Sequence, residues 1–323
     1  MIVRFIIHHL WLVDLLCLLV APLLIIVVCR LLGRRHRGRN SVVGIVLALL
    51  AAATYGYGRF VGTKQLEVRR VTLTFADLPS AFDGYRLVQF SDLHLGTLPD
   101  GMLQRVVDSI NAQQPDLILF TGDMVNCESS EMERQLPQLE RLKAKDAICS
   151  VLGNHDYGFY EYDGAFEADS DEGRLVTMQI DMKWRVFMNG YRYVRRGDQR
   201  LVIAGMENDG EDATLRSPQK GDLSAALDGI RRNDFVVLLE HDPTSWRRKI
   251  LRHCHAQLTL SGHTHGGQLS ILGWSPASLR YRECEGLYTL NRRHLYVTKG
   301  IGGAIPFRLG ATPEIVVITL KKK

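Results

Sequence analysis

Five short, largely apolar runs are each followed by Asp, Asn or His, and this pattern constrains the fold more than any other feature of the chain. The runs are 87–90, 117–120, 148–152, 235–239 and 256–260. Runs of this length and composition predict strands in sheets that are covered on both faces. Segment 99–111 has apolar residues at helical spacing, so we expect helices between strands and an α/β layered fold. Sites in such folds gather beyond the carboxyl ends of the strands.

The residues that follow these runs form a set of oxygen and nitrogen donors without a thiolate. They are Asp92, His94, Asp123, Asn154, His241, His263 and His265. Such a set suits Zn, Mn, Fe or a Mg-like ion better than a structural cysteine–zinc site. Seven donors are too many for one tetrahedral ion and suit two divalent ions, with a shared carboxylate and a bridging hydroxide that attacks phosphorus. Taken singly, Asp92 also fits a helix cap, and Asn154 or His241 a turn.

The order of these motifs resembles that of the calcineurin-like metallophosphoesterases. Asp-x-His, Gly-Asp, Gly-Asn-His-Asp, His and Gly-His-x-His follow one another within residues 85–270. The closing residues 300–317 resemble the membrane-associated bacterial branch of that superfamily. The resemblance implies a four-layer αββα sandwich and two divalent metal ions. It also implies that Asp92, His94 and His265 hold one ion, that Asn154, His241 and His263 hold the other, and that Asp123 bridges them.

The resemblance implies a separate role for His155, which is a general acid or transition-state stabiliser at the leaving oxygen and not a ligand. A protonated imidazole can assist a departing alkoxide. Asn126 departs from the protein-phosphatase branch, where an aspartate supports the equivalent histidine. Asn126 can still accept a hydrogen bond, and we expect Asp156 to supply the missing charge to His155. The arginine-bearing motifs of the protein phosphatases are absent, so a protein substrate is disfavoured.

Two apolar segments precede these motifs, at 5–29 and 41–57, and both approach the roughly 20 residues that span a bilayer. Five arginines lie between them, at positions 30, 34, 35, 37 and 39. Such a loop favours the cytoplasm, which would place both ends and the following domain outside it. The basic residues Arg59 and Lys64 oppose this orientation. We expect Asp14 to lie near one end of its segment or to pair within the hairpin.

Two other interpretations of the first 60 residues remain open. Arg34-Arg35, followed by an apolar stretch and Ala51-Ala52-Ala53, also fits a twin-arginine export signal with a cleavage site. An interfacial hairpin that does not cross the bilayer also fits. Residues 1–60 carry 7 of the 40 Lys and Arg but only 1 of the 35 Asp and Glu, so the remainder is nearly neutral. That balance argues against a nucleic-acid partner.

We therefore expect a membrane anchor over 1–60 and one metallophosphoesterase domain over 61–323. Within that domain, Ser130 and Glu133 predict a capping box for a helix reaching about residue 143. Segment 157–221 predicts only short strands, at 184–188, 191–195 and 201–204, and a short helix is predicted beyond it at 225–230. Segment 270–293 predicts an irregular loop, and 65–75, 294–298 and 314–320 predict further strands. The six cysteines show no C-x-x-C spacing, and their spacing alone specifies no disulfide.

The functional hypothesis is a membrane-anchored binuclear phosphoesterase that hydrolyses a phosphomonoester, a phosphodiester or a pyrophosphate. The anchor favours a lipid-linked or envelope substrate, and soluble nucleotides or sugar phosphates are the alternative. The second hypothesis is a non-catalytic metal-binding scaffold on the same fold, which would be expected to lose ligands. Three other histidines lie outside the pattern, and we expect them at surface or packing positions: His253, His255 and His294.

Overall fold

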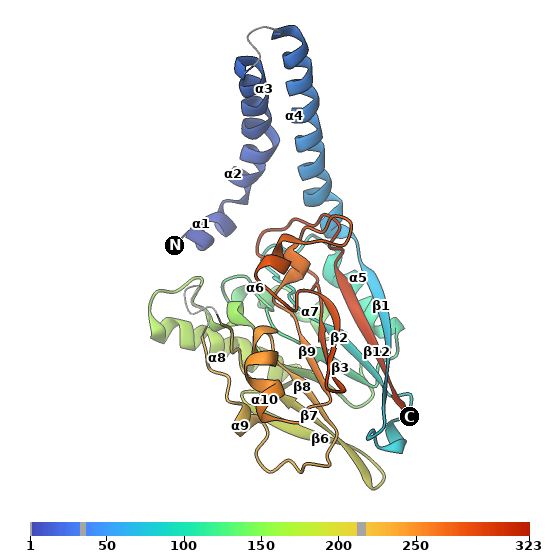
Figure 1. Cartoon of the computed structure of the whole chain (residues 1–323). Helices are drawn as coiled ribbons and strands as arrows, with labels where there is room; N and C mark the ends of the chain where they lie inside the picture. The colour runs from blue at the N-terminus through green and yellow to red at the C-terminus, as the bar shows by residue number, and fades with distance from the viewer. Residues whose placement is uncertain (1, 33–36, 212–217) are drawn as a thin grey trace.

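Two six-stranded sheets form the centre of the molecule, as the computed structural model shows for residues 2–32, 37–211 and 218–323 (Figure 1). The first sheet has the order β1-β12-β2-β3-β4-β5 and the second β10-β11-β9-β8-β7-β6. The strands of the first sheet are β1 (Glu67–Phe75), β2 (Arg86–Phe90), β3 (Leu117–Phe120), β4 (Ala147–Ser150), β5 (Arg185–Val186) and β12 (Glu314–Lys322). The strands of the second are β6 (Gly190–Arg196), β7 (Gln199–Gly205), β8 (Val236–Leu239), β9 (Leu258–Ser261), β10 (Gly286–Leu290) and β11 (Arg293–Val297).

Side-chain alternation along the strands separates the core into layers. In β2, Leu87 points between the two sheets, whereas Val88 and Phe90 point to the outer face of the first sheet. That outer face is covered by α5 (Met102–Ala112) and α8 (Ala165–Asp181), and the outer face of the second sheet by residues 246–256. The remaining short helices of the domain are α6 (Ser130–Glu133), α7 (Leu136–Leu139), α9 (Leu223–Ala226) and α10 (Leu251–His253). The structure confirms the predicted αββα sandwich.

The functional end of the sandwich follows from strand direction. β2, β3 and β4 are parallel neighbours in one sheet, and β8 and β9 are parallel neighbours in the other. These five strands correspond to the five apolar runs, so the donor residues that follow them leave the two sheets at carboxyl ends. The candidate site is therefore assembled from loops of both sheets.

The N-terminal helices project from the domain as a hairpin (Figure 1). Helices α1 (Ile2–His8), α2 (Leu10–Leu15) and α3 (Ala21–Leu32) form one arm, with a π-helical stretch at Leu16–Val20, and α4 (Arg37–Phe60) forms the other. By length and composition, Leu10–Leu32 and Gly38–Lys64 can each cross a membrane. The predicted pairing of Asp14 within the hairpin is confirmed, because Arg59 Nε lies 3.0 Å from its carboxylate and Tyr55 donates to it at 2.8 Å. Arg34 and Arg35 of the predicted arginine loop lie outside the described residues.

Three predictions of local structure were wrong. The helix predicted for 130–143 is divided into α6 and α7, because Pro137 lies at the start of α7 and would clash within a continuous helix. The capping box is also absent, since the Ser130 hydroxyl donates to Glu128 instead. Segment 270–293 contains β10, which is joined to β11 by a turn with positive φ at Asn291 and Arg292.

The long helix α8 lies in the segment for which only short strands were predicted. Its buried face carries polar residues, and these find partners only in the folded chain. Asp171 accepts hydrogen bonds from the Ser129 hydroxyl and main-chain N–H, and Gln179 accepts one from Ser150. A helix with a polar buried face lacks the apolar spacing by which helices are found in sequence.

Candidate metal centre

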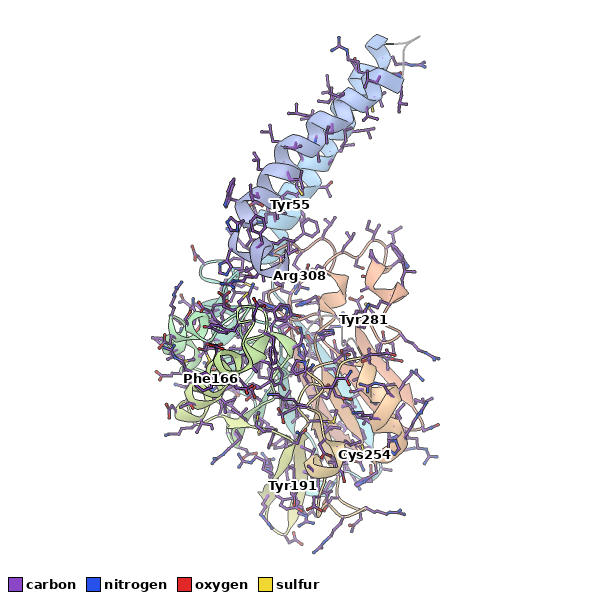
Figure 2. All side chains as sticks on the ribbon, turned by 90° about the vertical axis from the view of Figure 1, so that its left-hand side faces the viewer. Tyr55, Phe166, Tyr191, Cys254, Tyr281 and Arg308 are labelled. Carbon is purple, nitrogen blue, oxygen red and sulfur yellow. The ribbon has the colours of Figure 1, made fainter. Side chains whose placement is uncertain are left out.

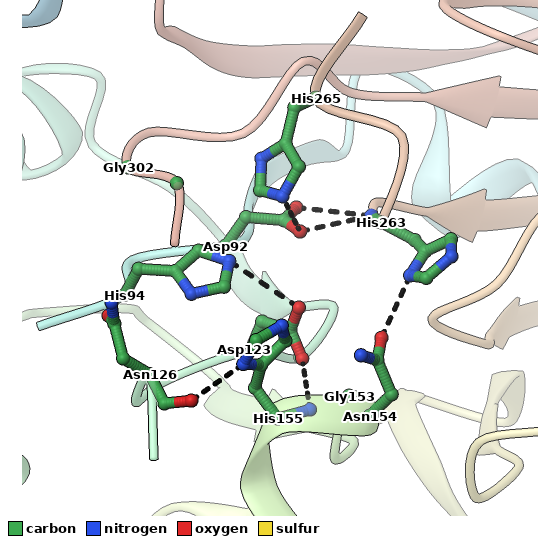
Figure 3. A network of polar contacts seen from close by, with 12 residues as sticks. Asp92, His94, Asp123, Asn126, Gly153, Asn154, His155, His263, His265 and Gly302 are labelled. Carbon is green, nitrogen blue, oxygen red and sulfur yellow. Dashed lines mark hydrogen bonds and ion pairs between the residues drawn. The ribbon is translucent and has the colours of Figure 1, made fainter. Parts of the chain in front are cut away.

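The seven predicted donor residues converge at the carboxyl ends of the central strands (Figure 3). One donor group comprises Asp92, His94, Asp123 and His265, whose ligand-type atoms lie within 4.8 Å of one another. A second group comprises Asp123, His241 and His263 under the same limit. Asn154 joins the second group, because its side-chain oxygen lies 2.8 Å from Nδ1 of His263. The two groups share the carboxylate of Asp123, so cations held by the two groups would be close neighbours.

Five of the seven donor residues adopt left-handed backbone conformations. Asp92, His94, Asp123, His263 and His265 all have φ between 47° and 70°, although none is glycine. Such conformations cost about 1–3 kcal/mol each and persist where the surrounding structure imposes them, commonly at functional sites. Hydrogen bonds between loops impose them here: the main-chain N–H of Asp92 donates to Gly122 at 2.8 Å, and that of His263 donates to the Asp92 carboxylate at 3.0 Å.

Close approach of the loops also requires glycine at two positions. A Cβ on Gly153 would lie 2.2 Å from the Asp123 carboxylate, and a Cβ on Gly262 would lie 2.4 Å from that of Asp92. A Gly–Asn or Gly–His step therefore brings the main chain against a carboxylate that no larger residue could approach. This explains why glycine precedes Asn154 and His263.

Imidazole nitrogens without a hydrogen-bond partner provide a test of whether these residues fit a metal. Both ring nitrogens of His94, Nε2 of His241 and Nδ1 of His265 are buried and make no hydrogen bond. Buried polar atoms are normally satisfied, and those that are not indicate an absent partner. His241 also donates from Nδ1 to the main-chain oxygen of Thr121 at 2.6 Å, which directs Nε2 toward the Asp123 carboxylate, 3.3 Å away. A metal-binding histidine is commonly oriented in this way.

The electrostatics of the cluster favour a cation. Burial opposes ionisation of Asp123, but His241 and His155 outweigh it and hold the pKa of Asp123 well below its usual range. Burial also opposes the charged form of His241, yet Asp123 raises the pKa of His241 to about 10. Burial and neighbouring cationic groups hold the pKa values of His94 and His265 well below their usual range. Neutral imidazoles bind metal, and His241 would release its proton on binding. The residues therefore fit divalent metal ions.

His155 lies beside the cluster but is held differently from the donor residues. Its Nδ1 donates at 2.6 Å to the main-chain oxygen of Asn126, because a carbonyl can only accept (Figure 3). The second ring nitrogen is therefore the one available to a substrate. The His155 ring stacks on Tyr160 with centroids 3.9 Å apart, and the main-chain N–H of His155 donates to Asp123 at 2.9 Å.

The expected support of His155 by Asp156 was wrong. The Asp156 carboxylate accepts hydrogen bonds from four main-chain N–H groups, those of Asp123, Met124, Val125 and Gly153. It therefore ties the loop after β3 to the loop after β4, and burial raises its pKa to about 7. Asn126 does support His155, but through its main-chain oxygen, while its side chain lies against Thr97.

Three residues near the centre were missed from the sequence. Tyr160 receives a hydrogen bond from the Asn154 amide at 2.9 Å, and the Tyr281 hydroxyl lies 3.2 Å from Nε2 of His263. The Arg308 guanidinium is buried and donates to the main-chain oxygen of His265 at 2.9 Å. None of the three belongs to an apolar run or a short motif. The one sequence signal for Arg308 is its position in the closing glycine-rich segment.

Comparison with known proteins identifies the same region. Residues 85–267 match the family described as calcineurin-like phosphoesterase. The metallophosphoesterase YkuE of Bacillus subtilis is 34% identical over 287 residues, which cover 85% of this chain and 92% of that protein. A transmembrane protein with metallophosphoesterase domain from Danio rerio is 31% identical, covering 91% of this chain and 67% of that protein. The UDP-2,3-diacylglucosamine pyrophosphatase LpxG of Chlamydia trachomatis is 26% identical, covering 85% of this chain and 97% of that protein.

Proposed function

This chain belongs to the calcineurin-like phosphoesterase family and is a hydrolase of phosphoester bonds, and on that premise we propose that it is a membrane-anchored, two-metal enzyme acting on a lipid-linked phosphate ester or pyrophosphate. One observation carries the proposal: seven donor side chains from both sheets meet around Asp123, with buried imidazole nitrogens left without partners. The family and this His and Asp cluster support divalent metal binding, and Mn, Zn and Fe are the candidates.

The proposed ligand assignment follows the two donor groups. Asp92, His94 and His265 would hold one ion, His241, His263 and Asn154 the other, and Asp123 would contact both. When bound, the two ions would supply positive charge to the phosphate oxygens and lower the pKa of the attacking water. The Asp156 carboxylate fixes the Asp123 loop, because it accepts a hydrogen bond from the main-chain N–H of Asp123. The Thr121 carbonyl fixes the His241 ring, because it accepts a hydrogen bond from Nδ1.

His155 is the proposed proton donor. The Asn126 carbonyl holds Nδ1–H, so the proton that can be transferred resides on Nε2 of the imidazolium. Stacking on Tyr160 restricts rotation of the ring. The leaving oxygen would accept this proton as the bond to phosphorus breaks. General acid catalysis of this kind contributes about 10²–10⁴-fold to the rate.

Two features support a lipid-linked substrate. The two apolar helices support membrane association, as does the likeness to a transmembrane relative. The Chlamydia relative bears the name of a pyrophosphatase whose substrate carries two acyl chains. We propose that both helices cross the membrane and that the 61–323 domain lies outside the cytoplasm. A reporter fused after Tyr57 that is active only in the cytoplasm would contradict this orientation.

The first experiment measures hydrolysis by the full chain in detergent, loaded with Mn²⁺ or Zn²⁺. The substrates are a nitrophenyl monoester, a bis-nitrophenyl diester and a lipid pyrophosphate. We expect Asp123→Asn to lose both activity and bound metal. His155→Asn should retain metal and lose about 10²–10⁴-fold in rate. His253→Ala is the matched control, since His253 is exposed and lies outside the cluster. Two bound metals per chain without turnover of any of these three substrates would instead support the non-catalytic scaffold.

A further inference from the structure

An exposed apolar segment directly follows the metal-donor motif. Within Ser270–Leu279, Leu272 is fully exposed and Leu279 is 81% exposed, and Ile271 and Trp274 are each exposed by more than half. Soluble surfaces rarely gather large apolar side chains in this way, and such patches mark interaction sites. The segment contains no acidic residue, and two exposed arginines, Arg280 and Arg282, follow it. Apolar residues with tryptophan beside basic residues are typical of segments that lie in a membrane interface.

This segment lies at the end of the domain from which the hairpin leaves. In Figure 1 it is the orange portion beside the base of α4, and Figure 2 places Tyr281 on that side of the domain, near Arg308. Hydrogen bonds connect the two regions. The main-chain N–H of Ser270 donates to Leu309 at 2.8 Å, and that of Arg308 donates to Gly58 of α4 at 2.9 Å. The apolar segment is therefore attached, through residues 308–310, to the helix that can cross the membrane.

The same segment is attached to the metal centre at both of its ends. It begins after His265, whose main-chain oxygen accepts a hydrogen bond from Arg308. It is followed closely by Tyr281, whose hydroxyl lies 3.2 Å from Nε2 of His263 and whose ring meets the His263 ring edge-on. A surface that covers Ser270–Leu279 would consequently lie next to the metal donors.

We propose that Ser270–Leu279 is a second membrane contact, which inserts Leu272, Trp274 and Leu279 into the bilayer interface beside the hairpin. The occupant of this surface is the lipid bilayer itself, because hydrogen bonds through residues 308 and 309 attach the segment to α4, the helix that can cross the membrane. Insertion removes the exposed apolar side chains from water and places the arginines at the level of the headgroups. It also holds the metal centre at the bilayer surface, where a lipid-linked phosphate can reach it without leaving the membrane. This last consequence rests on the proposed function.

Insertion can be measured without any enzymatic assay. Trp184 and Trp246 are buried and Trp11 lies in the hairpin, so Trp11→Phe leaves Trp274 as the exposed tryptophan. The full-length Trp11→Phe chain is placed in nanodiscs of phosphatidylcholine and phosphatidylglycerol with brominated acyl chains. We expect bromine to quench its fluorescence, and the added Trp274→Phe change to remove that quenching. Quenching that is the same with and without Trp274, or Trp274 quenched by aqueous acrylamide as in free solution, would overturn the proposal.

A second experiment separates the membrane contact from catalysis. Leu272→Asp should lower hydrolysis of a hexadecyl nitrophenyl phosphodiester in nanodiscs about tenfold and leave the soluble bis-nitrophenyl diester unchanged. Ile180→Asp is the matched control, since Ile180 is exposed at the C-terminal end of α8, outside the apolar segment, and its substitution should change neither rate. Equal loss on both esters would contradict membrane contact. A changed mass of the Leu272→Asp chain in detergent would show that a second copy covers the segment, which also overturns it. If the wild type hydrolyses neither diester, bromine quenching alone decides the insertion, and the proposed function is judged separately on the monoester and the lipid pyrophosphate.

Discussion

The interior of the sandwich and the loops at its functional end are built on opposite principles. Between the sheets, side chains such as Leu119, Ile203 and Val237 are apolar, fully buried and enclosed by one another. At the functional end, residues that are equally buried are charged or carry imidazoles, and several of the buried ring nitrogens make no hydrogen bond. The backbone also differs there, since five donor residues adopt left-handed conformations.

This contrast indicates that the sheets contribute favourably to the free energy of folding and that the loops at the functional end oppose it. Burial of apolar surface stabilises the sheets by about 25 cal/mol per Å². Unpaired imidazoles and strained backbone cost free energy at the ends of the same strands. A rigid interior is what allows those costs, because it holds the loops in one arrangement. Metal ions would return part of the lost free energy when they bind.

The largest expected effect on stability comes from a substitution between the two sheets. Leu119→Ala removes a fully buried side chain between the sheets and should lower the free energy of unfolding by about 2–5 kcal/mol. Denaturant unfolding of the full chain in detergent, followed by the fluorescence of Trp184 and Trp246, measures it. The folded fraction should still bind metal with unchanged stoichiometry. Loss of metal from folded chains would show that the interior and the functional end are not separable.

Metal removal should have the next largest effect. Ions that bind only the folded chain stabilise it by about 3–4 kcal/mol at concentrations 100–1,000 times the dissociation constant. Chelation should therefore lower the midpoint of the same unfolding transition in the wild type. The Asp123→Asn variant is the control, because chelation should change it little. An equal shift in both would place the stabilising metal elsewhere.

Gly153→Ala should affect the functional end and spare the interior. The new methyl group would lie 2.2 Å from the Asp123 carboxylate, so that carboxylate must move. Displaced supporting groups typically cost about 10–100-fold in metal affinity. Calorimetric titration of the metal-free chain with Mn²⁺ measures this loss. Unchanged affinity would mean that Asp123 tolerates displacement and contributes less than its central position indicates.

Gly173→Ala should have the smallest effect on stability, and it should raise stability where the other changes lower stability or metal affinity. Gly173 lies inside α8, and a Cβ there would meet no atom within 4 Å. Alanine should stabilise the chain by about 0.5–1 kcal/mol, because it restricts the unfolded state and favours helix. Metal affinity should not change. A destabilised Gly173→Ala chain would indicate that α8 needs the flexibility of glycine, and the contrast with Gly153 would weaken.

Much of the candidate site could be predicted because its signal is local. Each of the strands β2, β3, β4, β8 and β9 is largely apolar, and each is followed within a few residues by a donor type. Strand direction then brings those donors to one end of the two sheets. The apolar hairpin was also predictable, because length and hydrophobicity suffice to identify a segment that can cross a bilayer. The helix α8 was not, because its polar face is satisfied by Ser129 and Ser150, whose positions depend on the fold.

Burial and spacing are properties of short segments, so the sequence alone predicted the α/β layering, the candidate donors and the apolar hairpin, while the four-layer sandwich followed from the family resemblance. Tertiary structure alone decided which groups meet. Arg308 reaches His265 across 43 positions, and His263 donates to Asp92 across 171. The support of His155 by a main-chain oxygen, and not by Asp156, was decided in the same way. Main-chain groups are identical at every position, so only the three-dimensional path of the chain can select which of them a side chain meets.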